Sequence, residues 1–242
     1  MKVIGVIPSR YGSKRFPGKP LARILGTPMI EWVIKAALES KSLSEIILAT
    51  DNEEIAGVGS KLGIKTVLTP SNIPTGTDRV WEVVKNIKPE MVLNIQGDEP
   101  LVSGDLIDRV VNTLISDKRA DICTPVYLET NLGYDTNRVK VVVNLEDYAL
   151  YFSRETIPYF SRNQERKYLI HIGVYAYRFN ALERFVSTPP TYLEMAENLE
   201  QLRALQIGMK IRIVYHNRQV IPVDTPKDIK TVEHILSKMN IR

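Results

Sequence analysis

The chain has 242 residues, of which 44% are hydrophobic, and a formal net charge of +4. This length suits one α/β domain with a sizeable insertion, and this hydrophobic content is ordinary for a globular chain with a full core. The mild charge comes from Lys and Arg residues scattered along the chain, so the composition does not require a nucleic-acid partner.

The single cysteine and the lack of a long apolar segment exclude further classes of protein. Cys123 alone cannot form an intrachain disulfide, and its place in an apolar run predicts a core position. No stretch of the sequence reaches the roughly 20 apolar residues that span a membrane. The N-terminal apolar run is also too short for a signal peptide. We therefore expect a cytoplasmic protein with no membrane partner.

The first predicted element is a buried strand at residues 3–7, and a basic loop follows it. Between residues 9 and 19 the loop carries Gly and Pro breakers and no acidic residue; its four cations are Arg10, Lys14, Arg15 and Lys19. Open α/β sheets bind ligands beyond the carboxyl ends of their strands, so we predict a site for a polyphosphate. A solvated basic loop is the alternative. The sequence argues against a Walker A loop, because Pro20 stands where that motif has Ser or Thr.

Strand and helix patterns alternate through the first half of the chain. Helical spacing at residues 30–37 precedes a strand at 46–49, a helix to about residue 62 and a strand at 64–68. This alternation predicts a doubly wound, mostly parallel sheet with helices on both faces.

Two polar segments in this half lie at the ends of predicted elements. The segment T-G-T-D-R at residues 75–79 begins a helix, where a threonine caps the helix or a nucleotide binds its N-terminus. The buried strand predicted at residues 91–95 ends in Q-G-D-E-P. Its Asp98 is placed to hold a metal ion bound to phosphates, or it forms an Asx turn.

The alternation lapses after a strand predicted at residues 122–126. Residues 139–143 and 148–152 predict an antiparallel pair. Period-two alternation over residues 169–177 predicts one strand, with His171 and Tyr175 on the face opposite the core.

The last part of the chain predicts a helix over residues 193–203 and a strand at 211–214. A further strand is expected at residues 220–223. Asp224 ends that strand, just before a terminal helix that has Pro226 in its first turn.

The pattern R-x-x-S-x-R-x-P-G-K-P in the basic loop resembles the signature of sugar nucleotidyltransferases, and closely that of the 3-deoxy-manno-octulosonate (Kdo) cytidylyltransferases. Further similar segments follow in order along nearly the whole chain, although Met195 and Asn198 depart from the family pattern. The resemblance implies one Rossmann-like nucleotidyltransferase domain over residues 1–242. Within it, approximately residues 127–205 would form an inserted β-rich segment for sugar binding and dimerisation.

The resemblance also implies a reaction, in which CMP passes from CTP to Kdo and pyrophosphate leaves, for lipopolysaccharide biosynthesis. It implies Mg²⁺ as the cofactor, held by Asp98 and Asp224, and a homodimer without a nucleic-acid partner. The catalytic residues that it implies are Arg10, Lys19, Asp98 and Asp224. The implied nucleotide-binding residues are Pro8, Arg10, Ser13, Arg15, Lys19, Thr75, Gly76, Thr77, Arg79 and Gln96. The implied sugar-binding residues are Gln96, Arg154, His171, Tyr175, Glu200 and Gln201.

Alternatives remain open at the level of the sequence. A related cytidylyltransferase would use 8-amino-Kdo or a nonulosonic acid, and a P-loop phosphatase or kinase would not release pyrophosphate. A basic nucleic-acid-binding module would show binding that depends steeply on salt. Three candidate residues also have structural interpretations: a surface ion pair for Arg154, a core histidine for His171 and a helix cap for Asp224.

Overall fold

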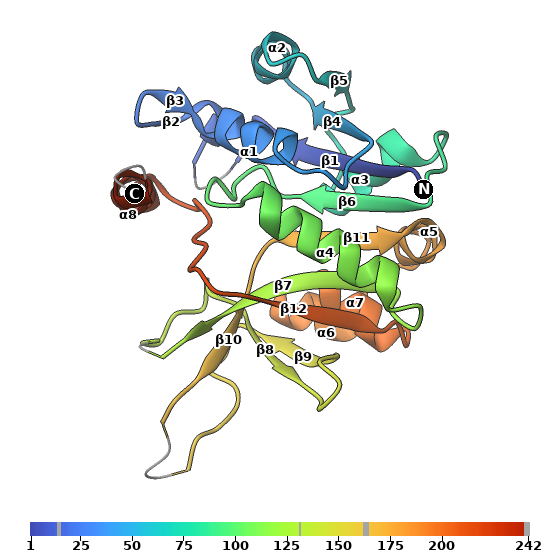
Figure 1. The fold of residues 1–242 in the computed structure, drawn as a ribbon, viewed down its shortest axis with the longest axis vertical. Coiled ribbons are helices and arrows are strands. Elements are labelled where there is room, and N and C mark those ends of the chain that lie inside the picture. The colour runs from blue at the N-terminus through green and yellow to red at the C-terminus, as the bar shows by residue number, and fades with distance from the viewer. Residues whose placement is uncertain (14–15, 131, 162–164, 240–242) are drawn as a thin grey trace. The chain divides into compact units, whose positions relative to one another are not determined.

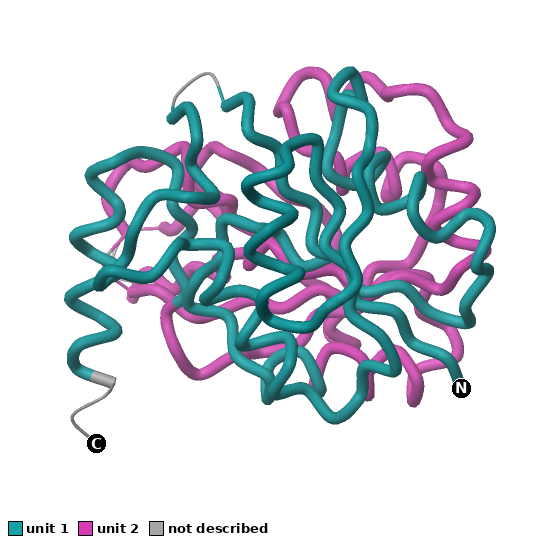
Figure 2. Tube along the Cα trace, turned by 90° about the horizontal axis from the view of Figure 1, so that it is seen from above, with its two compact units in different colours: residues 1–108, 220–242 teal, residues 109–219 magenta. Residues whose placement is uncertain are grey.

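The structure is a computed structural model of the chain that describes residues 1–13, 16–130, 132–161 and 165–239. The chain divides into two compact units, drawn in two colours in Figure 2. Unit 1 comprises Met1–Asp108 and Val220–Arg242, and unit 2 comprises Arg109–Gln219. The segment expected to bind the sugar, residues 127–205, falls within unit 2.

Unit 1 is built on the parallel sheet that the sequence predicts. Its first strand, β1 (Val3–Ser9), is buried along its whole length. It pairs in parallel with β4 (Glu45–Thr50) on one side and with β6 (Met91–Ile95) on the other. Since β4 also pairs in parallel with β5 (Lys65–Leu68), the strand order is β5-β4-β1-β6. The apolar runs are continuous because a parallel sheet with helices on both faces buries both sides of its central strands.

Three helices connect these strands: α1 (Met29–Leu38), α2 (Glu53–Lys61) and α3 (Gly76–Val84). The chain moves outward from β1 through β4 to β5 and then returns to β6. Because such crossovers are right-handed, this reversal places α3 on the opposite face from α1, as Figure 1 shows. Asn52 caps α2 and Thr75 caps α3, each by accepting backbone N–H groups. The loops after β1 and β6 therefore lie at the switch point of the sheet, where ligand sites form.

Several elements outside the parallel sheet complete unit 1. The basic loop leads into a 3-10 turn, η1 (Lys19–Leu21), and then into the hairpin of β2 (Arg23–Ile24) and β3 (Thr27–Pro28). The C-terminal helix α8 (Pro226–Met239) begins at a proline, as predicted. Helix α4 (Gly104–Ser116) begins in unit 1 and ends in unit 2.

Unit 2 is organised around β7 (Ile122–Glu129), whose Cys123 is buried as predicted. On one edge β7 pairs antiparallel with β10 and β11, and on the other it pairs in parallel with β12. The predicted antiparallel pair of β8 and β9 is confirmed and continues from β10. The bounds are β8 (Lys140–Val143), β9 (Ala149–Ser153), β10 (Tyr168–His171), β11 (Val174–Arg178), β12 (Ile211–His216), α5 (Phe179–Val186), α6 (Tyr192–Glu197) and α7 (Gln201–Gln206). The parallel sheet of unit 1 and the mixed sheet of unit 2 confirm the α/β class.

The prediction of one continuous strand over residues 169–177 is wrong. Strand β10 ends at His171 and β11 begins at Val174, whose N–H donates to the carbonyl of Ile172 at 2.7 Å. His171 lies opposite Val126, whereas Ala176 lies opposite Cys123, so two extra residues are inserted against β7. An insertion of two residues keeps the alternation of faces, because side chains repeat every second residue. The break is therefore invisible in the period-two pattern.

The prediction of one helix over residues 193–203 is also wrong. Helix α6 ends at Glu197, and Asn198 adopts the left-handed conformation, with φ 53° and ψ 52°. Helix α7 then starts at Gln201. Asparagine visits this conformation more readily than most residues and can stop a helix without a glycine or proline signal.

The strand expected at residues 220–223 does not form within the described residues. The segment instead runs without regular structure, and the N–H of Val223 donates to the carbonyl of Asp98 at 2.9 Å. This hydrogen bond ties the approach to Asp224 to the turn that follows β6. Asp224 is therefore positioned by a loop and not by the end of a strand.

Candidate active site

Three segments of unit 1 converge on the ammonium of Lys19. Its Nζ donates to Asp98 Oδ2 at 2.5 Å and to the carbonyl of Val223 at 2.9 Å, and it lies 3.9 Å from Asp224 Oδ1. Gly18, which precedes η1 with φ 68°, supplies the left-handed residue that turns Lys19 in this direction. The structure thus brings together three residues that the sequence places 79 and 126 positions apart.

The pair of aspartates fits a divalent cation. Both carboxylates lie within 4 Å of one positive charge, so together they exceed that charge by one. Among the described residues, no group of three or more His, Cys, Asp or Glu side chains gathers to form a closed metal site. Magnesium suits such a partial set, because it is usually held by one or two carboxylates together with phosphate oxygens and water.

The N-terminus of α3 forms a second part of this candidate site. A Cβ on Gly76 would lie 3.2 Å from the amide of Gln96 and 3.5 Å from Cγ of Pro8, so only glycine lets these side chains pack so close to the helix start. Gln96 donates to Asn94 at 3.1 Å, which orients its amide. Thr75 caps the helix, whereas Thr77 is buried. The other N–H groups of the first turn suit an anionic group.

Arg79 is buried in unit 1, with 2% of its surface exposed. Desolvation lowers the pKa of its guanidinium, while the charge of Asp51 opposes this shift. Asp51 Oδ2 lies 3.5 Å from the guanidinium, and Asp51 Oδ1 accepts the N–H of Tyr11 at 2.9 Å. Asp51 therefore ties the start of the basic loop to a buried cation. The sequence shows only an aspartate at a strand end, so this role was missed.

The other residues of the basic loop differ in their surroundings. Arg10 is exposed, and its charge is among the causes that lower the pKa of Arg79, so these two cations act on one another. Ser13 accepts the N–H of Phe16 at 3.3 Å and so helps to shape the loop. Arg15, expected to bind the nucleotide, lies outside the described residues.

In unit 2, the break between β10 and β11 brings His171 and Tyr175 together, with ring centroids 5.0 Å apart. His171 is half-buried, and its Nε2 lies 2.9 Å from the hydroxyl of Thr124. Desolvation lowers the pKa of His171 to about 3, so the ring is neutral near pH 7. The candidate sugar residues on this segment are therefore a neutral imidazole and a phenol.

A consequence for stability follows from the low pKa of His171. An unfolded histidine binds a proton below about pH 6.5, whereas folded His171 stays neutral down to about pH 3. Stability that is present above pH 6.5 is therefore lost as the pH falls towards 3. Between pH 6 and pH 5 we expect the unfolding free energy to fall more steeply for the wild type than for His171→Asn, by up to about 1.4 kcal/mol per pH unit. Urea unfolding at both pH values measures this difference, and equal slopes would contradict it. His234→Asn, at an exposed site on α8, is the control.

Arg154 donates all its side-chain hydrogen bonds to backbone carbonyls. Its Nε lies 2.8 Å from the carbonyl of Glu197, and its two Nη atoms lie 2.9 Å and 3.1 Å from those of Thr136 and Asn198. The Glu197 carboxylate in turn accepts the N–H of Arg154 at 2.9 Å. Arg154 therefore joins the loop at Thr136 to the C-terminal end of α6, and its charge is not neutralised by a carboxylate within these contacts.

Lys140 supports this arrangement from inside unit 2, with 1% of its surface exposed. Its Nζ donates to the carbonyls of Asp135, Arg138 and Arg154. Burial lowers the pKa of its ammonium, and the charge of Asp135 opposes this shift. A lysine on the inward-facing side of a predicted strand is the signal that could have revealed this role.

The remaining sugar candidates lie at the start of α7. Glu200 is the residue before the helix, and Gln201 is its first residue and is buried. A buried ion pair holds α6 against α7: Arg203 donates to the Glu194 carboxylate from Nε at 2.7 Å and from Nη2 at 2.5 Å. The position of Glu200 and Gln201 therefore depends on this pair.

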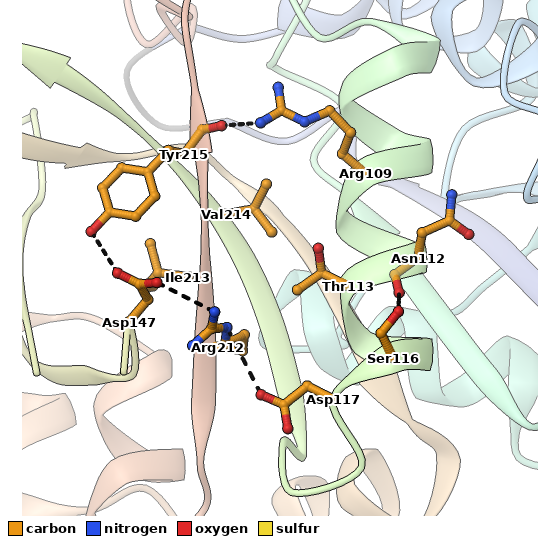
Figure 3. Close-up of a pocket in the computed structure, with 10 residues that line it drawn as sticks. All are labelled: Arg109, Asn112, Thr113, Ser116, Asp117, Asp147, Arg212, Ile213, Val214 and Tyr215. Atoms are coloured by element: carbon orange, nitrogen blue, oxygen red, sulfur yellow. Dashed lines mark hydrogen bonds and ion pairs between the residues drawn. The ribbon is translucent and has the colours of Figure 1, made fainter. Parts of the chain in front are cut away.

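An open pocket of about 720 Å³ lies in unit 2 beside α4 and β12, as Figure 3 shows. Arg212 lies between two carboxylates there, 3.3 Å from Asp147 Oδ2 and 3.8 Å from Asp117 Oδ2. The Tyr215 hydroxyl donates to Asp147 at 3.0 Å. These charges pair with one another, and none of the ten described lining residues is a predicted site residue. We therefore assign the pocket no part in the candidate site.

The switch point of a doubly wound sheet, with a cationic loop, a helix N-terminus and two convergent aspartates, defines an enzyme of the nucleotidyltransferase class. Comparison with known proteins specifies the family. The cytidylyltransferase family matches residues 4–211. The chain therefore belongs to the cytidylyltransferase family, among its 3-deoxy-manno-octulosonate cytidylyltransferases. Members of the family generally use a divalent metal ion.

Individual relatives agree with this assignment. The chain is 44% identical to the 3-deoxy-manno-octulosonate cytidylyltransferase of Bdellovibrio bacteriovorus, and the match covers 100% of both chains. It is 43% identical to that of Chlamydia trachomatis serovar L2, over 97% of this chain and 94% of the relative. A solved structure of CMP:2-keto-3-deoxy-manno-octonic acid synthetase complexed with CTP has the same fold, with a TM-score of 0.91 and 34% identity over 99% and 100% of the two chains.

No helix in the described part of the chain is both long and apolar enough to cross a membrane.

Proposed function

We propose that the chain transfers CMP from CTP to Kdo, forming CMP-Kdo and pyrophosphate for lipopolysaccharide biosynthesis. The observation that carries this proposal is the convergence of Lys19, Asp98 and Asp224 in a chain of this family. The curated relatives are named for Kdo, which favours it over 8-amino-Kdo or a nonulosonic acid. Membership of the family also argues against the kinase, phosphatase and nucleic-acid-binding alternatives.

The reaction joins the anomeric hydroxyl oxygen of Kdo to the α-phosphorus of CTP, and the hydroxyl proton is released to solvent. The bond from that phosphorus to the bridging oxygen breaks, and the oxygen leaves with its electron pair as part of pyrophosphate. Negative charge grows on the leaving group and on the α-phosphate oxygens, so fixed cations close to these positions lower the barrier. Lys19 and Arg10 supply such charges in unit 1, and the N–H groups at the start of α3 add their partial charges.

Asp98 and Asp224 would hold the divalent cation, which we propose is Mg²⁺. When bound, this ion supplies charge neutralisation at the phosphates and orients them for attack. Lys19 donates to one of these carboxylates and lies within 4 Å of the other, so its charge favours both being turned towards the same place.

Unit 2 carries the proposed sugar contacts. Kdo is an acid, and Arg154 offers a guanidinium whose hydrogen bonds among the described residues go to backbone carbonyls and not to a carboxylate. His171, Tyr175, Glu200 and Gln201 offer groups that exchange hydrogen bonds with sugar hydroxyls. The Gln96 amide beside α3 would contact the nucleotide or the sugar.

The test of the proposed function is pyrophosphate release with each nucleotide and each sugar. We expect CTP and Kdo to give the highest kcat/KM, with EDTA stopping the reaction and added Mg²⁺ restoring it. Equal turnover with UTP would point to a broader sugar nucleotidyltransferase. A higher kcat/KM with 8-amino-Kdo in parallel assays would identify the amino sugar as the substrate.

Tyr175→Phe is expected to weaken the use of Kdo and to leave CTP binding nearly unchanged. The change removes a hydroxyl from unit 2, and the loss of one neutral hydrogen bond typically costs about 0.5–1.5 kcal/mol. The KM for Kdo should therefore rise several-fold. A matched loss of CTP affinity, measured by calorimetric titration without sugar, would remove Tyr175 from the sugar site.

We also propose that the chain forms a homodimer through the segment at residues 127–205. Several large apolar side chains of this segment are well exposed, among them Tyr134, Tyr159 and Tyr192 at 76%, 91% and 75%. Contiguous exposed apolar patches mark association sites, and these side chains are the candidates for such a patch in this segment. Sedimentation equilibrium measures the state, and a monomer at micromolar concentration would refute the dimer.

A further inference from the structure

Thr124 lies in the middle of β7 and is completely buried, yet its hydroxyl has three neighbours. The hydroxyl oxygen lies 2.7 Å from the carbonyl oxygen of Val174 and 3.4 Å from that of Ile172. It also lies 2.9 Å from Nε2 of His171. All three neighbours belong to the break between β10 and β11, which the sequence pattern does not reveal.

The count of protons decides the direction of each hydrogen bond. A threonine hydroxyl has one proton to donate, and a carbonyl oxygen can only accept. Two oxygens 2.7 Å apart need a proton between them, so the hydroxyl proton points at Val174. The same hydroxyl can then only accept from His171. Nε2 of His171 therefore carries a proton.

We propose that Thr124 is a positioning residue, which holds His171 as the Nε2–H tautomer and leaves Nδ1 as an acceptor for a hydroxyl of the acidic sugar. The ligand part of this inference rests on the proposed function, whereas the tautomer does not. The ring meets the Thr124 hydroxyl through Nε2 and not through Nδ1. A neutral ring keeps only one proton, so with Nε2 protonated, Nδ1 offers a lone pair.

The packing of the ring supports this assignment. Phe152 meets the imidazole edge-on, with centroids 5.5 Å apart and an interplanar angle of 89°, and the Tyr175 ring is tilted by 38° with its centroid at 5.0 Å. The low pKa of His171, about 3, keeps the ring from gaining a second proton near pH 7. Ring packing of this kind does not by itself select a tautomer, whereas the hydrogen bond to Thr124 does.

The experiment uses the full chain labelled with ¹⁵N-histidine, in which the chain's three histidines are assigned with the help of His171→Asn. Ring ¹⁵N shifts at pH 7 report the tautomer. We expect the wild type and Thr124→Ser to show His171 protonated at Nε2. In Thr124→Val, which keeps nearly the same shape without the hydroxyl, we expect a mixture of tautomers or the Nδ1–H form. An Nδ1–H tautomer in the wild type would overturn the proposal, and this outcome does not depend on either Thr124 variant.

Kinetics on the same proteins test the consequence for the sugar. We expect Thr124→Val to raise the KM for Kdo about five-fold, the effect of one neutral hydrogen bond, with kcat and the KM for CTP nearly unchanged. Thr124→Ser should restore the wild-type KM. Ile213→Val, a small deletion in the buried part of β12, is the control and should leave the KM for Kdo unchanged. An altered tautomer with an unaltered KM for Kdo would overturn the link to the sugar. Absence of turnover of CTP and Kdo in the wild type would instead refute the proposed function and leave the tautomer result standing.

Discussion

The double variant Asp98→Asn/Asp224→Asn is expected to be little slower than either single variant, although each single change should cut turnover on the order of 100-fold or more. Both carboxylates lie within 4 Å of Lys19 Nζ, which shows that they face one position. If they share one cation, the first substitution already loses it, and the second removes a contact that no longer exists. Steady-state rates of pyrophosphate release with CTP and Kdo give the comparison.

Asp228→Asn is the matched control for this experiment. The Asp228 carboxylate accepts the N–H groups of Asp224 and Thr225, at 3.0 Å and 2.7 Å, and so caps α8 close to the proposed metal site. Its loss should cost about 1 kcal/mol of stability with little effect on the rate. Losses that multiply in the double variant, or full activity of the wild type in EDTA, would refute a shared cation. Asp224 would then be a structural residue at the start of α8.

Much of unit 1 could be predicted because its signals are local. Apolar runs of the right length mark β1, β4 and β6, and Thr75 and Asn52 carry the cap chemistry of their helices. Lys19 and Asp98 follow strand ends, and parallel strands share one carboxyl edge, so their meeting follows from topology.

The rest could not be predicted because it depends on contacts between distant segments. Two extra residues between β10 and β11 keep the side-chain period, so the break before Val174 leaves no trace in the pattern. Asn198 ends α6 inside a run of good helical spacing. Asp51 gains its role from Arg79, which is remote in sequence. Lys140 gains its role from three backbone carbonyls outside the strands, at Asp135, Arg138 and Arg154. Composition and periodicity do not indicate which residues become partners in the folded chain.

The residue roles that the resemblance implies are predictions, and the contacts in the structure show which experiment tests each role. Arg154 illustrates this, because the sequence around it is equally compatible with a solvated arginine and with the observed contacts to three carbonyls. A test of Arg154 by substitution must therefore measure the affinity for the sugar and the unfolding free energy of unit 2 separately. The same separation is needed for the helix pair α6 and α7, whose junction carries Glu200 and Gln201.

The buried pair of Glu194 and Arg203 has the largest expected effect on the stability of unit 2. Their side chains are 10% and 5% exposed. Arg203 also donates to the carbonyl of Thr188 at 3.1 Å and stacks on Phe185 at 4.5 Å, while the Glu194 carboxylate accepts the N–H of Thr191 at 3.0 Å. The pair thus joins α6, α7 and the segment that precedes them.

Arg203→Leu is expected to destabilise the protein by about 3–5 kcal/mol, because it leaves the Glu194 carboxylate buried without its cation. The double variant Glu194→Leu/Arg203→Leu should recover most of this loss, since an apolar pair of similar position needs no compensating charge. It should remain about 1 kcal/mol below the wild type, because the cap that Glu194 provides to Thr191 is gone. Urea unfolding of the three proteins measures these differences, and the KM for Kdo should rise in Arg203→Leu while the KM for CTP stays near the wild-type value. A double variant as unstable as Arg203→Leu would show that the guanidinium's contacts with Phe185 and Thr188, and not its pairing with Glu194, hold α7 in place.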